Sequence, residues 1–134
     1  MSGSAPRVPG RILVIDDDRS ARMLLERVLT RAGHTVVLVD TAEEGLTKLK
    51  AEPFDLLVTD KNLPGIDGLE VLRQAREKNP ELQAILITGF PTHETRTHAT
   101  ELGVFSYVTK PFGVHDILEI CNRAIASQQA GAPQ

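Results

Sequence analysis

Three consecutive carboxylates follow a short apolar run near the start of the sequence. In the segment ILVIDDD, Asp16, Asp17 and Asp18 come directly after four apolar residues of the kind found in buried strands. Like charges this close together destabilise a fold unless a cation or a basic side chain neutralises them. The sequence therefore predicts a positive group beside these residues, either a metal ion or a basic side chain.

Other polar residues stand at the ends of further apolar runs. Asp60 and Thr88 each close such a run, and Lys110 lies just past another. Ligands of doubly wound parallel sheets bind outside the carboxyl ends of the strands, so these side chains are expected at one edge of a sheet. A cluster of carboxylates suits a hard divalent cation, and Mg²⁺ in particular combines a few carboxylates with water and phosphate oxygens. The sequence thus predicts a Mg²⁺ site, assisted by Lys110, whose carboxylates come from Asp16, Asp17 and Asp60.

Five apolar runs provide the strands that would position these residues. Their Val, Ile and Leu content without strict alternation is typical of strands buried on both faces. The runs are residues 11–16, 35–40, 54–60, 82–88 and 104–109. Amphipathic segments with helical periodicity separate them. Strand–helix units repeated in this way predict an α/β domain with a parallel sheet and helices on both faces, because parallel neighbours need crossover connections.

Capping residues mark where several of these helices begin. Thr41 with Glu44, and Asp67 with Glu70, have the spacing of capping boxes. Asp18 is interpreted as a further helix cap rather than as a metal ligand, because a single Asp after a strand most often has that role.

Three segments depart from this regular pattern. Residues 92–103 contain four threonines and few apolar residues, which predicts a marginal, mobile fourth helix. The ends, residues 1–10 and 127–134, are rich in Gly, Ser, Pro, Ala and Gln and are predicted to be flexible tails. The domain itself is therefore expected to span residues 11–126.

Composition excludes several classes of function. A length of 134 residues suits one domain, and we expect no second output domain. The net charge of −3 and the absence of a Lys/Arg run argue against direct nucleic-acid binding. A single cysteine, no signal peptide and no membrane-spanning run indicate a soluble cytoplasmic protein without a membrane partner.

Four motifs in order, ILVIDDD, LLVTDKNLPGIDGLEVL, ILITG and YVTKPF, resemble the receiver (CheY-like) domain of bacterial two-component response regulators. The similarity covers roughly residues 11 to 126. It implies a doubly wound (βα)5 flavodoxin-like three-layer sandwich with parallel strand order 2-1-3-4-5. The first and fifth helices would cover one face of the sheet, and the second, third and fourth the other.

The resemblance also implies a role for each site residue. Asp60 would be the phosphoacceptor, and Mg²⁺ would be held by Asp16, Asp17, Asp60 and the backbone carbonyl of Asn62. Lys110 would bind the phosphoryl group, and the bond before Pro111 would be cis. Thr88, followed by the small Gly89, and Tyr107 would form the switch.

The function implied is that of a stand-alone receiver rather than an enzyme, capable at most of self-phosphotransfer and slow autodephosphorylation. The donor would be a sensor histidine kinase or a histidine phosphotransfer protein. Phosphorylation would change the surface of helix 4, strand 5 and helix 5, to which a downstream protein effector binds.

Two alternatives remain open at this stage. The segment DDDRS is close to the D-x-D-x-[TV] motif of haloacid-dehalogenase-like phosphatases, with Asp16 as nucleophile and Asp18 as acid/base. A receiver-like interaction module that signals without phosphorylation is the second alternative, although such a domain would typically have lost a site residue.

Overall fold

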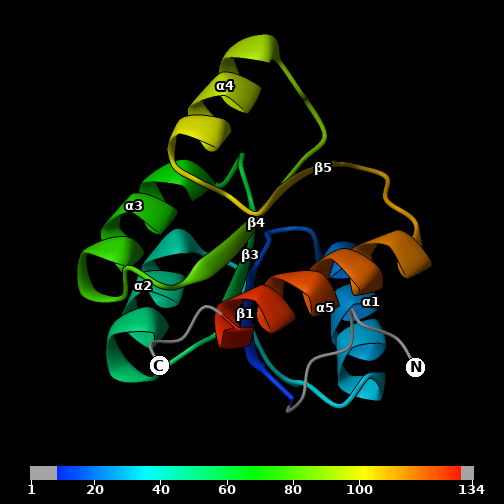
Figure 1. Ribbon diagram of the computed structural model, residues 1–134. Coiled ribbons are helices and arrows are strands. Elements are labelled where there is room, and N and C mark those ends of the chain that lie inside the picture. Colours follow the sequence, from blue (N-terminus) through cyan, green and yellow to red (C-terminus); the bar gives the residue numbers. More distant parts are fainter. Residues whose placement is uncertain (1–8, 131–134) are drawn as a thin grey trace.

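The computed structural model of the protein describes residues 9–130, while residues 1–8 and 131–134 of the two predicted tails lie outside the described residues. Strands and helices alternate along the chain (Figure 1). The elements are β1 (Arg11–Ile15), α1 (Arg19–Arg31), β2 (Thr35–Val39), α2 (Ala42–Ala51), β3 (Leu56–Asp60), α3 (Gly68–Lys78), β4 (Gln83–Thr88), α4 (His93–Glu101), β5 (Ser106–Thr109) and α5 (Val114–Ala130).

The five strands form one parallel sheet in the order β2-β1-β3-β4-β5, which confirms the predicted topology. The order reverses between β1 and β3, where Ile15 lies opposite Thr59. Asp60 in turn lies opposite Ile87, one residue before Thr88. The register therefore brings the carboxyl ends of the central strands, with their polar residues, to the same edge of the sheet.

Helices cover both faces of the sheet, with α1 and α5 on one side and α2 and α3 on the other (Figure 1). Alternate strand residues serve the two cores: Ile12 and Val14 pack toward α1 and α5, whereas Leu13 and Ile15 pack toward α2 and α3. Because both faces of the central strands β1, β3 and β4 are buried, most of their positions need an apolar side chain, and burying each one contributes about 1.5–3 kcal/mol. This explains the uninterrupted apolar runs.

The predicted caps begin their helices. Asp18 Oδ1 accepts a hydrogen bond from the Ser20 N–H, and Thr41 Oγ1 accepts one from the Glu44 N–H. Asp67 caps α3 in the same way through the Glu70 N–H. Asp18 is thus occupied in starting α1, as predicted.

Helix α4 is the least buried of the helices, as its sequence indicates. Ala99 is its one buried residue. Its carboxyl end is held by Arg76, whose guanidinium donates hydrogen bonds to the carbonyls of Leu82, Leu102 and Gly103. A helix with a single buried side chain can shift more easily than its neighbours.

The ordered chain extends beyond the predicted boundaries of 11 and 126. Helix α5 continues through Ala130, because the Ala and Gln residues after Ala126 are compatible with a helix as well as with a tail. At the other end Gly10 is buried, and its N–H donates to Nδ1 of the buried His34. No helix among residues 9–130 is long and apolar enough to span a membrane.

Candidate functional site

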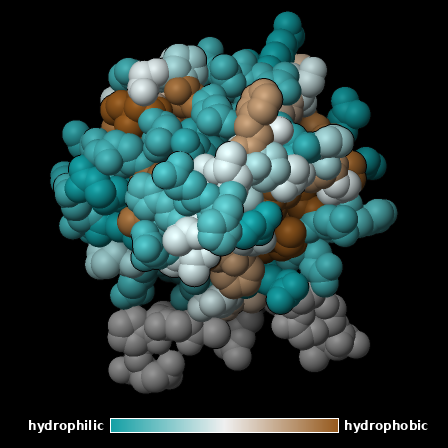
Figure 2. Space-filling model, turned by 90° about the horizontal axis from the view of Figure 1, so that it is seen from above, coloured by the Kyte–Doolittle hydropathy of each residue, from teal (hydrophilic) through white to brown (hydrophobic). Residues whose placement is uncertain are grey.

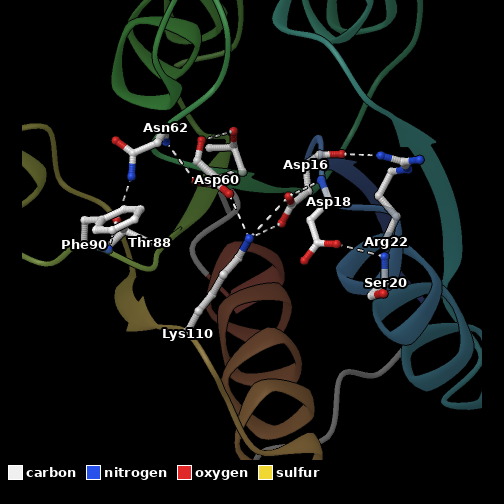
Figure 3. A network of polar contacts seen from close by, with 10 residues as sticks. Asp16, Asp18, Ser20, Arg22, Asp60, Asn62, Thr88, Phe90 and Lys110 are labelled. Carbon is white, nitrogen blue, oxygen red and sulfur yellow. Dashed lines mark hydrogen bonds and ion pairs between the residues drawn. The ribbon is translucent and has the colours of Figure 1, made fainter.

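Three carboxylates meet where β1 and β3 end. One oxygen each from Asp16, Asp17 and Asp60 lies within 4.8 Å of the others. Asp16 is 1% exposed and Asp60 is also buried, whereas Asp17 is exposed. Figure 3 shows Asp16 and Asp60 directed toward the same point from adjacent strands. The structure therefore brings together the three aspartates that the sequence pattern assigned to one edge.

Lys110 supplies a positive charge between them. Its Nζ lies 2.8 Å from Asp60 Oδ2 and 3.0 Å from Asp16 Oδ2 (Figure 3). Burial by itself lowers the pKa of this lysine, but the hydrogen bonds and charges of the two aspartates outweigh it, so its pKa is raised. The lysine stays protonated in this site. The peptide bond from Lys110 to Pro111, where the resemblance implies a cis bond, is cis.

The charged form of the Asp16 carboxyl is in an unfavourable environment. The pKa of this carboxyl is raised, mainly by burial and in smaller part by the charge of Asp60. The Asp18 N–H and Lys110 lower the pKa, but they do not cancel the effect of burial. Its Oδ1 accepts hydrogen bonds from the Asp18 N–H at 2.9 Å and from Lys110 Nζ at 3.3 Å. Its buried Oδ2 has the ion pair with Lys110 but accepts no hydrogen bond from the described residues. The guanidinium of Arg22 is close by but donates to the backbone carbonyl of Asp16 at 2.7 Å.

These features fit a divalent cation. With all three carboxylates ionised, Lys110 leaves two negative charges without compensation inside the cluster. Carboxylate oxygens are the ligands that Mg²⁺ prefers, and the buried Asp16 Oδ2 offers an oxygen with spare capacity. The donor set therefore suits Mg²⁺, with Asp16, Asp17 and Asp60 as the residues that would hold it.

Asn62 connects the carboxylate of Asp60 with the end of β4. Its backbone N–H donates to Asp60 Oδ1 at 2.8 Å, and its side-chain Nδ2 donates to Thr88 Oγ1 at 3.0 Å. The N–H of Phe90 also donates to Thr88 Oγ1, at 3.0 Å. The resemblance assigned Asn62 a role through its backbone carbonyl alone. Sequence reasoning missed the side-chain contact, which joins residues far apart in the chain.

Space around the site is set by two glycines. A Cβ at Gly89 would meet no atom within 4 Å, so the space beside this residue is open. At Gly68, by contrast, a Cβ would lie 2.3 Å from the backbone oxygen of Asp60, a contact that only displacement of the backbone could relieve. Gly68 therefore lets the start of α3 pack directly against the backbone of Asp60. In the sequence, the position of Gly68 directly after the helix cap Asp67 was the signal that could have pointed to this close packing.

Tyr107 belongs to β5, and its side chain contacts α4. Its ring packs against Leu86 and Ala99, and the guanidinium of Arg96 stands 4.5 Å from the ring centroid. Its hydroxyl is buried and has no hydrogen-bond partner among the described residues. The aromatic ring is thus in contact with the weakly packed helix α4, and its polar end is poorly satisfied in this arrangement.

The surface around the strand ends is mostly hydrophilic (Figure 2). Phe90 is an exception, with 78% of its surface exposed beside Thr88. His93 and His98 line a groove of about 600 Å³ between α4 and the start of α3, which also contains Lys61 and Asp67. Within residues 9–130, the aspartate cluster is the one group of His, Cys, Asp or Glu side chains with metal-binding geometry.

Comparison with known proteins gives one family. The family model of the response regulator receiver domain matches residues 12–122. The DNA-binding transcriptional regulator NtrC of Salmonella typhimurium is 35% identical over 120 residues, which is 90% of this chain and 26% of that protein. The chain therefore spans about a quarter of the length of this relative.

Two solved receiver structures are similar over nearly their whole length. A CheY-like receiver domain protein from Methanospirillum hungatei is 31% identical with a TM-score of 0.87, covering 91% of this chain and 98% of that one. The beryllofluoride-activated NtrC4 receiver domain dimer is 29% identical with a TM-score of 0.84, covering 88% of this chain and 98% of that one.

Proposed function

This chain belongs to the response regulator receiver domain family, and from that membership we propose that it is a phosphoacceptor whose Asp60 takes a phosphoryl group from a phosphohistidine. The donor is a sensor histidine kinase or a histidine phosphotransfer protein. The observation that carries the proposal is the setting of Asp60. Its two oxygens contact Lys110 and the Asn62 N–H, and it shares one cluster with Asp16 and Asp17.

The chemistry requires positioning and charge compensation from this chain. A carboxylate oxygen of Asp60 attacks phosphorus in line, the new P–O bond forms, and the P–N bond breaks with its electron pair returning to the donor imidazole. Lys110, held 2.8 Å from Asp60, neutralises charge on the phosphoryl oxygens. When bound at the three aspartates, Mg²⁺ supplies further positive charge to those oxygens. Open space beside Gly89 admits the donor.

Signalling then depends on Thr88 and Tyr107. The acyl phosphate offers new acceptor oxygens to the Thr88 hydroxyl, and a change there alters the space available to the Tyr107 ring. Because the ring contacts α4 through Ala99 and Arg96, the surface formed by α4, β5 and α5 changes with it. A downstream protein effector reads that surface by contact.

Phosphorylation with a small-molecule donor tests the assignment. Incubation with acetyl phosphate and MgCl₂ should add one phosphate, seen by intact-mass spectrometry, and Asp60→Asn should remove the label. Asp40→Asn is the matched control, because Asp40 also directly follows a strand but is exposed and outside the cluster. Label that persists in Asp60→Asn, or that disappears in Asp40→Asn, contradicts the proposal.

The same experiment addresses both alternatives. A phosphorylation-independent interaction module would take up no label in any variant. The haloacid-dehalogenase-like phosphatase has little support, since Asp18, its intended acid/base, caps α1 through Ser20. That enzyme would lose its label with Asp16→Asn and keep it with Asp60→Asn.

A further inference from the structure

The hydroxyl of Thr88 has an unusual set of partners. A threonine hydroxyl can accept two hydrogen bonds and donate one. In this structure Oγ1 accepts one from the Asn62 side-chain amide and a second from the Phe90 backbone N–H, each at 3.0 Å. Thr88 itself is fully buried. Both acceptor positions of the hydroxyl are therefore filled.

The hydroxyl proton, in contrast, has no acceptor among the described residues. With two N–H groups on the oxygen, the proton is left with the one remaining tetrahedral direction. A buried donor without an acceptor is unfavourable, and a new acceptor that arrives along this direction gains a pre-oriented hydrogen bond. Asn62 links this hydroxyl to Asp60, since its own backbone N–H holds Asp60 Oδ1.

We propose that Asn62 is a positioning residue whose side-chain amide fixes the Thr88 hydroxyl as a hydrogen-bond donor toward the phosphoryl group on Asp60. The inference rests on the proposed function and adds the regulation of that site. The Phe90 donor belongs to the backbone and is always present. The Asn62 amide is therefore the part of this arrangement that the sequence can change. Without it the hydroxyl regains a second orientation and loses part of its preorganisation.

Beryllofluoride, a phosphoryl mimic, provides the test. Its dissociation constant is measured by calorimetry at saturating MgCl₂ for the wild-type chain and for Asn62→Leu, which has a similar volume but no donor. The Asn62 side chain is exposed and its backbone N–H remains, so the variant should fold. Loss of one hydrogen bond predicts binding weaker by about two- to tenfold. Asn79→Leu, at the far end of α3, is the matched control and should bind as the wild type does.

A double-mutant cycle separates positioning from other effects. If Asn62 acts through the Thr88 hydroxyl, Asn62→Leu should leave the affinity of a Thr88→Val chain unchanged. Tyr107 gives a second readout, because it is the only tyrosine and the chain has no tryptophan. Its fluorescence change on mimic binding should be smaller in Asn62→Leu even at saturation, which a purely structural role for Asn62 would not cause.

Four outcomes would overturn the inference. The first is beryllofluoride binding by Asn62→Leu that is as tight as, or tighter than, binding by the wild-type chain. That result would mean that the Asn62 amide stabilises the unphosphorylated arrangement of Thr88 instead of preparing it for the phosphoryl group. The second is an equal loss of affinity in the Thr88→Val background, because the amide would then act elsewhere. The third is an unaltered tyrosine response. A wild-type chain that binds no beryllofluoride would overturn the proposed function itself, and the inference with it.

Discussion

At the scale of single residues, the buried carboxyl of Asp16 makes the stability of the fold depend on pH. Burial is the main cause that raises the pKa of its carboxyl above the ordinary 3.8. A carboxyl whose pKa is higher in the folded than in the unfolded chain binds more protons when folded. Its contribution to stability is therefore present at pH below 3.8 and is lost as the pH rises through the folded-state pKa. At neutral pH the ionised Asp16 destabilises the metal-free protein.

Asp16→Asn should therefore stabilise the metal-free chain. We expect the free energy of unfolding at pH 7 to rise by about 1 kcal/mol, the scale of one partly shielded charge interaction. The fall in stability as the pH increases above 3.8 should also become shallower. Urea titrations across this pH range measure both effects, with Asp40→Asn as control. A less stable Asp16→Asn chain would mean that the contact with Lys110 outweighs the penalty of burial.

Helix α4 is the element on which switching would depend. Thr92 caps its first turn by accepting from the Thr95 N–H, and Arg76 holds its carboxyl end. Between these ends only Ala99 is buried, and the guanidinium of Arg96 stacks on the Tyr107 ring. Local order in this helix is thus carried by its two ends and one aromatic contact.

Amide exchange across residues 92–103 should be faster than in α3 or α5. Two arrangements of α4 should differ by about 1–3 kcal/mol, a typical allosteric coupling, so the rates should also change with Mg²⁺ and beryllofluoride. Hydrogen-exchange mass spectrometry of the wild-type chain, with and without the mimic, provides the measurement. Exchange in α4 as slow as in α3, and indifferent to the mimic, would move the output surface elsewhere.

At the scale of the whole molecule, the carboxylate cluster should link cation binding to folding. Asp16 and Asp17 follow β1 and Asp60 ends β3, so the three carboxylates come together only in the native sheet, and Mg²⁺ should bind the folded chain in preference to the unfolded one. Preferential binding raises the free energy of unfolding by about 2.7 kcal/mol when the free ion reaches roughly 100 times its dissociation constant.

Thermal unfolding in MgCl₂ should therefore show a higher midpoint than in NaCl of equal ionic strength. Asp17→Asn should remove most of the difference between the two salts, because it takes one carboxylate out of the cluster. The variant should still fold, since Asp17 is exposed and lies outside both cores. The same midpoint in both salts for the wild-type chain would argue against a cation at this cluster.

Local signals in the sequence determined the elements and the edge at which the polar residues gather. Uninterrupted apolar runs required strands buried on both faces, and the caps Asp18, Thr41 and Asp67 act within three residues of themselves. Alternation of strands and helices then required crossovers. The meeting of Asp16, Asp17, Asp60 and Lys110 followed from these patterns, while their roles in phosphorylation stay predictions.

The tertiary structure alone decided which side chains touch across the site. The amide of Asn62 meets a hydroxyl 26 residues away, Gly68 admits the backbone of Asp60, and Arg96 covers Tyr107. The composition of residues 127–134 predicted a flexible tail, whereas α5 continues through Ala130, because Ala and Gln suit a helix as well as a tail. Periodicity and capping report on neighbours within a turn or two. Contacts between distant residues depend on how whole elements pack, which no local pattern encodes.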